Sequence, residues 1–68
     1  MSIMQRLYDS EINAVVYSFY DNGFRVYLGD EMNGYRADTT VQTWDEVEQW
    51  LDTQARIHFP DSAYARGS

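Results

Sequence analysis

Hydrophobic and polar positions along the chain change from helical spacing to strand spacing and back. Residues 2–9, SIMQRLYD, place apolar side chains four apart, which predicts a short helix capped by Ser2. Such a short helix forms only if Met4 or Leu7 docks on a core, and a frayed terminus is the alternative. Residues 12–20, INAVVYSFY, are mostly β-branched or aromatic, which predicts a strand.

The Asn22-Gly23 dipeptide predicts a hairpin between this strand and a return strand at residues 24–28, FRVYL. Asn-Gly is the strongest short hairpin signal, because a type I′ turn needs positive φ at both central positions. With Asn22 and Gly23 at the tip, Phe19 faces Val26, and side chains alternate between the two faces. The predicted core face consists of Val15, Tyr17, Phe19, Phe24, Val26 and Leu28. The predicted outer face consists of Ala14, Val16, Ser18, Tyr20, Arg25 and Tyr27.

A third strand is predicted at residues 35–41, YRADTTV, after a loop at 29–34 that holds a second Asn-Gly. Alternation puts Tyr35 and Ala37 on one face and Arg36 on the other. If Tyr35 and Ala37 point inward, Arg36 joins Arg25 on the outer face of the sheet.

A long helix is predicted from Trp44 to His58. Thr43 and Glu46 form a capping box, in which the threonine accepts from the Glu46 amide and the glutamate reaches back. The apolar stripe follows helical spacing, and Pro60 ends the element. Its members are Trp44, Val47, Trp50, Leu51, Ala55 and His58. We expect Trp44, Val47, Leu51 and Ala55 to contact the core face of the sheet. The tail after Pro60 is loose unless Tyr64 folds back on the domain.

These elements define the predicted fold class, α+β. A three-stranded antiparallel β-meander carries one long C-terminal α-helix on one face, with a short N-terminal helix. The 68 residues allow one domain, assigned to residues 1–66, and residues 67–68 are typical of a cloning remnant. Cysteine is absent and aromatic residues make up 16 % of the chain, so rings are expected to supply much of the core.

Charge narrows the classes of partner. Eleven acids against five arginines, with no lysine, give a formal net charge of −6. This balance disfavours phosphate and anionic lipid and favours a basic partner. No apolar run approaches the roughly 20 residues that span a bilayer, and the N-terminus lacks a signal pattern, so we expect a cytoplasmic protein without a membrane partner.

Catalytic, metal and cofactor chemistry is not indicated by any motif. The chain lacks cysteine and a Gly-x-Ser-x-Gly elbow, and its one histidine, His58, lies near a predicted helix end. Counted from Asp30, a calcium loop would need oxygen ligands where Met32 and Val41 stand. The sequence therefore predicts a non-enzymatic protein with no cofactor, no metal site and no catalytic residue.

The predicted outer face is the candidate binding site, formed by Tyr20, Arg25, Tyr27 and Arg36. Tyrosine and arginine are the usual anchors of protein interfaces, which favours a protein partner or a second copy of the chain. Aromatic and arginine side chains on an open sheet also suit single-stranded nucleic acid, although the net charge disfavours it. The third alternative is ordinary cross-strand packing with no binding role.

The order of strand, Asn-Gly hairpin, third strand and the helix TWDEVEQWL resembles small bacterial and phage domains. It is similar to the arm-binding domain of phage integrases, which implies DNA binding through the sheet, but those domains are lysine-rich. It also resembles HicB-like antitoxins, which implies a small basic toxin as partner, although GDEMNG replaces their Pro-Asp-x-Pro-Gly stretch. Double-stranded-RNA-binding domains share the element order, but Asp45 and Glu46 replace their basic helix start.

Overall fold

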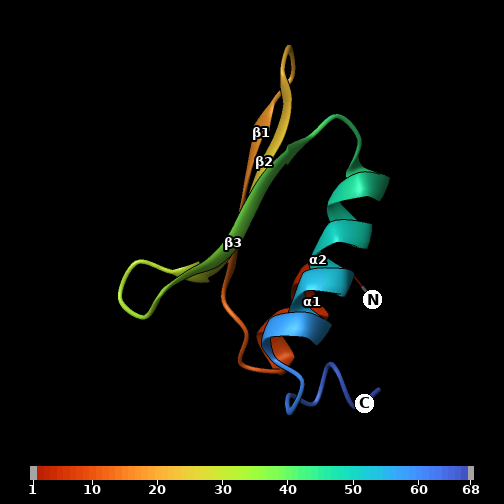
Figure 1. Ribbon diagram of the computed structural model, residues 1–68. Coiled ribbons are helices and arrows are strands. Elements are labelled where there is room, and N and C mark those ends of the chain that lie inside the picture. The colour runs from red at the N-terminus through yellow and green to blue at the C-terminus, as the bar shows by residue number, and fades with distance from the viewer. Residues whose placement is uncertain (1, 68) are drawn as a thin grey trace.

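The computed structural model describes residues 2–67 and forms an α+β fold (Figure 1). Three antiparallel strands form one sheet in the order β1-β2-β3, with bounds Ala14–Phe19, Gly23–Asp30 and Gly34–Val41. Helix α1 spans Ile3–Asp9 and helix α2 spans Trp44–His58. Both helices lie on the same side of the sheet, and no element within residues 2–67 covers the opposite face (Figure 1). The predicted fold class is confirmed.

Helix α2 begins at the predicted cap, and the middle of its predicted apolar stripe packs on the sheet. At the two ends of the stripe, Trp44 is 40 % exposed, although its ring contacts Phe24, and His58 is exposed. The Thr43 hydroxyl accepts from the Glu46 amide at 3.2 Å and donates to the Glu46 carboxylate at 3.1 Å, which satisfies one free amide of the first turn. Val47, Leu51 and Ala55 are fully buried. They point to the sheet face that the helices cover, the inner face.

Helix α1 forms although it has only seven residues. The Ser2 hydroxyl accepts from the Gln5 amide at 3.2 Å, and Ile3 and Leu7 are buried in the core. Docking of Leu7 supplies the stability that two helical turns lack by themselves. The prediction of a capped, docked helix is confirmed, and the frayed alternative is not observed.

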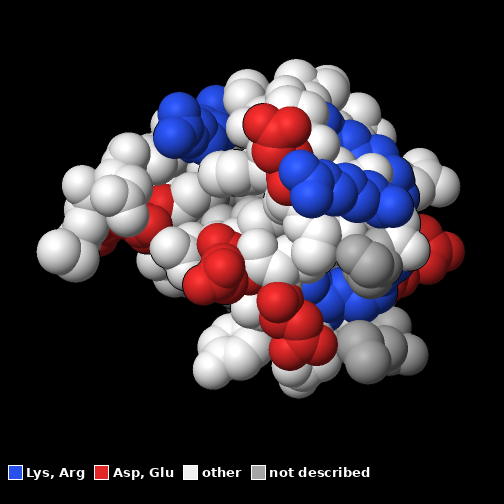
Figure 2. Space-filling model, turned by 90° about the horizontal axis from the view of Figure 1, so that it is seen from below, with Lys and Arg blue, Asp and Glu red and all other residues white. Residues whose placement is uncertain are grey.

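The segment after Pro60 is held in place by Tyr64. This ring is fully buried, and its hydroxyl donates to the Asp52 carboxylate of α2 at 2.6 Å. The guanidinium carbons of Arg6 and Arg56 lie 4.6 and 5.4 Å from its centroid, so cation–π contacts join both helices to the tail. Seen from this end of the molecule, basic and acidic side chains are interspersed (Figure 2). Of residues 67–68, which are predicted to be a cloning remnant, Ser68 lies outside the described residues, as does Met1 of the predicted domain 1–66.

The register of the first hairpin corrects the sequence prediction. Phe19 pairs with Gly23 and Val16 with Val26, which shifts β1 by three residues relative to the predicted pairing. The Asn22 amide donates to the Phe19 carbonyl at 2.9 Å, so the turn has Tyr20 and Asp21 at its centre. Gly23 follows with φ of +83°. A shift by an odd number exchanges the two faces of a strand.

As a result β1 presents to the core the residues that were predicted to be outside. Ala14 and Val16 pack against the core, whereas Tyr17 and Phe19 are 51 % and 50 % exposed on the opposite face. The prediction held for β2, where Val26 and Leu28 are fully buried. The physical reason is that both faces of β1 are apolar, so alternation alone does not orient the strand, and the smaller side chains fit beneath the helices.

A β-bulge in β3 makes a second correction. The pairing Leu28 to Ala37 is followed by Gly29 to Tyr35, which leaves Arg36 as the extra residue. Gly29 has φ of +110°, and a Cβ there would lie 2.6 Å from the Gly34 carbonyl oxygen, so only glycine fits the bulge. The bulge moves Tyr35 to the outer face and takes Arg36 away from it.

Candidate protein-binding surface

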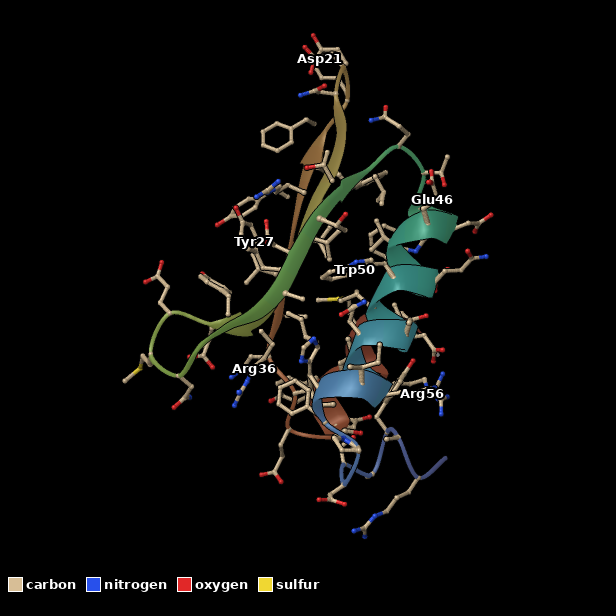
Figure 3. All side chains as sticks on the ribbon, viewed as in Figure 1. Asp21, Tyr27, Arg36, Glu46, Trp50 and Arg56 are labelled. Carbon is tan, nitrogen blue, oxygen red and sulfur yellow. The ribbon has the colours of Figure 1, made fainter. Side chains whose placement is uncertain are left out.

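The uncovered face of the sheet carries a row of aromatic side chains, which we call the outer aromatic face. It consists of Tyr17 and Phe19 from β1, Tyr27 from β2 and Tyr35 from β3. Figure 3 shows Tyr27 projecting from the sheet on the side away from α2, whereas Trp50 of α2 points toward the sheet. Tyr17 and Phe19 stand two residues apart on one strand and therefore share a face.

The rings of this row contact one another across the strands. Tyr17 meets Tyr27 edge to face, with centroids 6.0 Å apart and planes at 89°. Tyr27 meets Tyr35 at 5.0 Å and 44°. Such contacts contribute about 0.5–1.5 kcal/mol each and hold the rings in fixed positions. Desolvation by these neighbours raises the pKa of Tyr35, and the nearby charge of Glu31 adds to the rise.

Arg25 lies beside the row, and its side chain is engaged within the sheet. Its guanidinium forms an ion pair with Asp38 and donates to Thr40 Oγ1 at 2.9 Å. Its Nε donates to Tyr27 Oη at 3.2 Å, and that hydrogen bond is the largest cause of the raised pKa of Arg25. Asp38 balances the charge of Arg25, so this part of the face offers little net positive potential to an anion.

A shallow hollow of about 460 Å³ opens on the outer aromatic face near the hairpin tip. Rings of Tyr17, Phe19 and Tyr27 form its apolar walls, and Asn22, Arg25 and Thr40 supply polar groups. Apolar walls with a few fixed polar groups are typical of sites that take a side chain of a binding partner.

Of the four predicted site residues, the structure brings only Arg25 and Tyr27 together. Tyr20 lies in the turn at the hairpin tip and is fully exposed, without the strand position that the predicted register gave it. Arg36 extends toward the end of α2, where its guanidinium carbon lies 5.7 Å from the Phe59 centroid (Figure 3). The expectation that Tyr20 and Arg36 share a face with Arg25 is therefore wrong, and a binding role for the four stays a prediction.

Sequence reasoning missed Tyr17, Phe19 and Tyr35 as members of this surface. The first two were assigned to the core because they are the largest apolar side chains of β1. A usable signal was present in the opposite set of β1, since Ala14, Val16 and Ser18 are small enough to lie under a helix. No sequence feature marked Arg36 as a bulge residue except the glycine at position 29.

Within residues 2–67 the structure holds no cluster of three histidine, cysteine or acidic side chains able to bind a metal ion. Within the same range, no helix has the length and apolar character needed to cross a membrane. His58 is exposed at the end of α2, with its Nε2 atom 3.2 Å from Gln54 Oε1. No protein-family model, curated protein or solved structure matches the chain.

The fold and the surface together define the class of this protein as a small α+β domain with one uncovered sheet face. The functional argument therefore rests on the chemistry of that face, because a fold by itself does not specify a function.

Proposed function

We propose that this domain is a non-enzymatic binding module that docks a protein partner through the outer aromatic face. The observation that carries the proposal is the exposure of Tyr17 and Phe19, each about half exposed, on a sheet face that neither helix covers. Tyrosine and phenylalanine are enriched at the buried centres of interfaces, where they contribute most of the binding free energy.

The fixed geometry of the rings supports this function. Contacts of Tyr27 with both Tyr17 and Tyr35 hold the row in place before any partner arrives. A preorganised surface loses less side-chain entropy on binding, so more of the contact energy appears as affinity. The net charge of −6 favours a basic partner, and a small basic toxin is one partner of that kind.

Single-stranded nucleic acid is the competing ligand for a face with stacked rings. Two features weigh against it. Asp38 pairs with Arg25, and Arg36 lies over Phe59, so neither arginine is positioned to accompany the rings toward a phosphate chain. A nucleic-acid ligand would then gain stacking with little counterion release.

The test is affinity capture from cells of the native host, followed by titration calorimetry with the purified captured protein. We expect Tyr17→Thr to weaken that complex by more than about 1 kcal/mol, as at an interface hot spot, with little dependence on salt. Threonine keeps a high strand propensity, so the variant removes the ring without weakening β1. Ile57→Thr is the matched control, because Ile57 is 60 % exposed on α2 and lies outside the sheet.

Two outcomes would overturn the proposal. One is equal affinity of the captured protein for the wild type and for Tyr17→Thr, which would place the interface elsewhere. The other comes from titrating labelled single-stranded DNA and RNA at low and moderate salt. Chemical-shift changes at Arg25 and Tyr27 with a steep loss of affinity in salt would assign the face to nucleic acid.

A further inference from the structure

The two edges of the sheet differ in how they are protected against another strand. Strand β3 carries Arg36 and Asp38 and is interrupted by the bulge opposite Gly29. Charges and bulges are the devices that keep an edge from pairing with a further strand. Strand β1, with the sequence AVVYSF, has no charge, no proline, no glycine and no break in its register. It is an unprotected edge of high strand propensity.

The backbone of β1 also presents free hydrogen-bonding groups. The Gly29 amide donates to the Asn13 carbonyl at 2.7 Å, so residue 13 directs its backbone toward β2. Residues of an antiparallel strand alternate in this respect, so Ala14, Val16 and Ser18 direct their N–H and C=O groups to the open edge. In the described range 2–67, no turn, loop or cap bonds to the backbone of these three residues.

Charge at the ends of β1 indicates which strand fits the edge. Glu11 precedes the strand and Asp21 follows it, and both are exposed. A second copy that satisfied all three open residues would pair antiparallel about Val16, with Ala14 opposite Ser18. That register brings the Glu11 end of each copy to the Asp21 end of the other. Like charges at these ends repel each other, so the edge suits a partner with basic ends.

We propose that β1 is a docking edge that accepts a β-strand from a partner protein. The partner segment is extended and uncharged at its centre, and it carries lysine or arginine at both ends. The inference rests on the proposed function and deepens it, because every second side chain of an added strand lies beside Tyr17 and Phe19. Backbone hydrogen bonds supply part of the affinity, and the outer aromatic face supplies selection among side chains.

In the first test, displayed random peptides of about ten residues are selected for binding to the immobilised protein. At about 3.3 Å per residue, this length is enough to span β1. We expect enrichment of peptides with β-branched or aromatic residues at alternate positions and lysine or arginine at the ends. No enrichment, or enrichment of acidic or proline-rich peptides, would overturn the proposal.

The second test measures amide hydrogen exchange with the best selected peptide. Val16 and Ser18 should become protected by about tenfold or more, because an added strand bonds their open amides. Val15 and Tyr17 are internal controls, since their amides face β2 and are protected before the peptide binds. If the peptide binds but the amides of Val16 and Ser18 stay unprotected, it docks on the outer aromatic face alone. That result would overturn strand addition at β1.

A variant pair separates this inference from the proposed function. Ser18→Pro removes an open amide and should weaken peptide binding by about tenfold or more, whereas Ser18→Ala should retain it. Ile57→Thr, on α2 and outside the sheet, should leave peptide binding unchanged. Tyr17→Thr should weaken binding of the captured protein even if strand addition at Ser18 fails, so the two proposals can fail separately. If Ser18→Pro does not fold, amide exchange of the wild type decides whether the peptide adds as a strand.

The free protein could instead form a dimer at the concentration of the exchange measurements. A dimer with a protected Val16 amide would assign the edge to a second copy and overturn the proposal of a basic partner.

Discussion

Strand β2 has two faces with opposite environments. Val26 and Leu28 on the inner face are fully excluded from solvent beneath the helices. On the outer face, Tyr27 is only half-buried, and the neighbouring Tyr17 and Phe19 leave about half of their surfaces exposed. Both faces are rich in apolar atoms, but only the inner one is covered by the chain itself. The inner face therefore supplies stability, and the outer face is the surface that the proposed partner would cover.

The largest effect is expected on the inner face. Leu51→Ala should lower the free energy of unfolding by about 2–5 kcal/mol, because it leaves a cavity between α2 and the sheet. Chemical denaturation measures this loss, which approaches the whole stability of a domain this small. Ile57→Ala on the same helix is the control and should stay within about 0.5 kcal/mol. Equal losses in the two variants would contradict the burial of Leu51 and the exposure of Ile57.

The bulge that separates Tyr35 from Arg36 depends on the glycine at position 29. Gly29→Ala should cost about 1–3 kcal/mol, because φ of +110° is unfavourable for alanine and the Cβ meets the Gly34 carbonyl. Thermal unfolding checks the loss, with Gly34→Ala as the control, since a Cβ at Gly34 meets nothing within 4 Å although its φ is also positive. The space around residue 29 decides the outcome, so a smaller loss at 29 than at 34 would contradict the geometry of the bulge.

The fold could be predicted because helix and strand signals were local. Thr43 and the apolar spacing of α2 fix that helix without reference to the rest of the chain, and Ser2 does the same for α1. The exact register of the hairpin is not determined by a local signal. Asn22-Gly23 marks a turn, but Gly23 also adopts positive φ when the turn is built on Tyr20 and Asp21. A three-residue loop and a two-residue loop therefore share one sequence signal.

The candidate site was predicted in part for the same reason. Arg25 and Tyr27 belong to β2, which is central and must bury Val26 and Leu28, so their face followed from alternation. Tyr17 and Phe19 belong to an edge strand whose two faces compete for the core. The larger side chains lie on the outer face, because the space under the helices holds Ala14 and Val16 and not two rings.

Tyr64 holds the tail, which the sequence predicts to be loose unless this residue folds back on the domain. Burial, and then the hydrogen bond to Asp52, raises the pKa of Tyr64 to about 12. The hydrogen bond from Tyr64 lowers the pKa of Asp52. Tyr64→Phe removes the hydroxyl and keeps the ring, so we expect a loss of about 1 kcal/mol near neutral pH, measured by urea denaturation.

The pH dependence of this difference has a definite sign. A raised folded-state pKa means that the neutral hydroxyl is favoured by folding, so its contribution is present below pH 10 and lost as the pH rises toward about 12. At the acid end, the lowered pKa of Asp52 means that its contribution is lost as the pH falls below the ordinary value of 3.8. The wild type should thus lose its advantage over Tyr64→Phe at both extremes. A difference that is constant with pH would contradict the bond.

Phe19 on the outer face and Val26 on the inner face should respond differently to the same substitution. Phe19→Thr should change the free energy of unfolding by about 0.5 kcal/mol or less, because the ring is half exposed and threonine suits a strand. The same kind of change at Val26, from valine to threonine, places a hydroxyl in the core and should cost more than about 1 kcal/mol. Thermal unfolding of the two variants compares the faces directly. A larger loss at Phe19 than at Val26 would reverse the assignment of the faces.

The smallest effect is expected at the ion pair of the outer face. Asp38→Asn removes the charge opposite Arg25 and keeps the shape of the side chain. Both partners are substantially exposed, so the change in unfolding free energy should be only a few tenths of a kcal/mol and should vanish at high salt. Denaturation at low and high salt measures it, with Asp61→Asn as a control at an exposed acid outside the sheet.

The salt dependence of Asp38→Asn also tests what keeps the aromatic row in order. If ring contacts hold Tyr27 between Tyr17 and Tyr35, the row persists without the ion pair, and ring-proton shifts of Tyr27 should match the wild type. A loss above about 1 kcal/mol together with shifted Tyr27 resonances would mean that the Arg25–Asp38 pair positions the rings. The outer face would then depend on charge, and salt would weaken a protein complex that we expect to tolerate it.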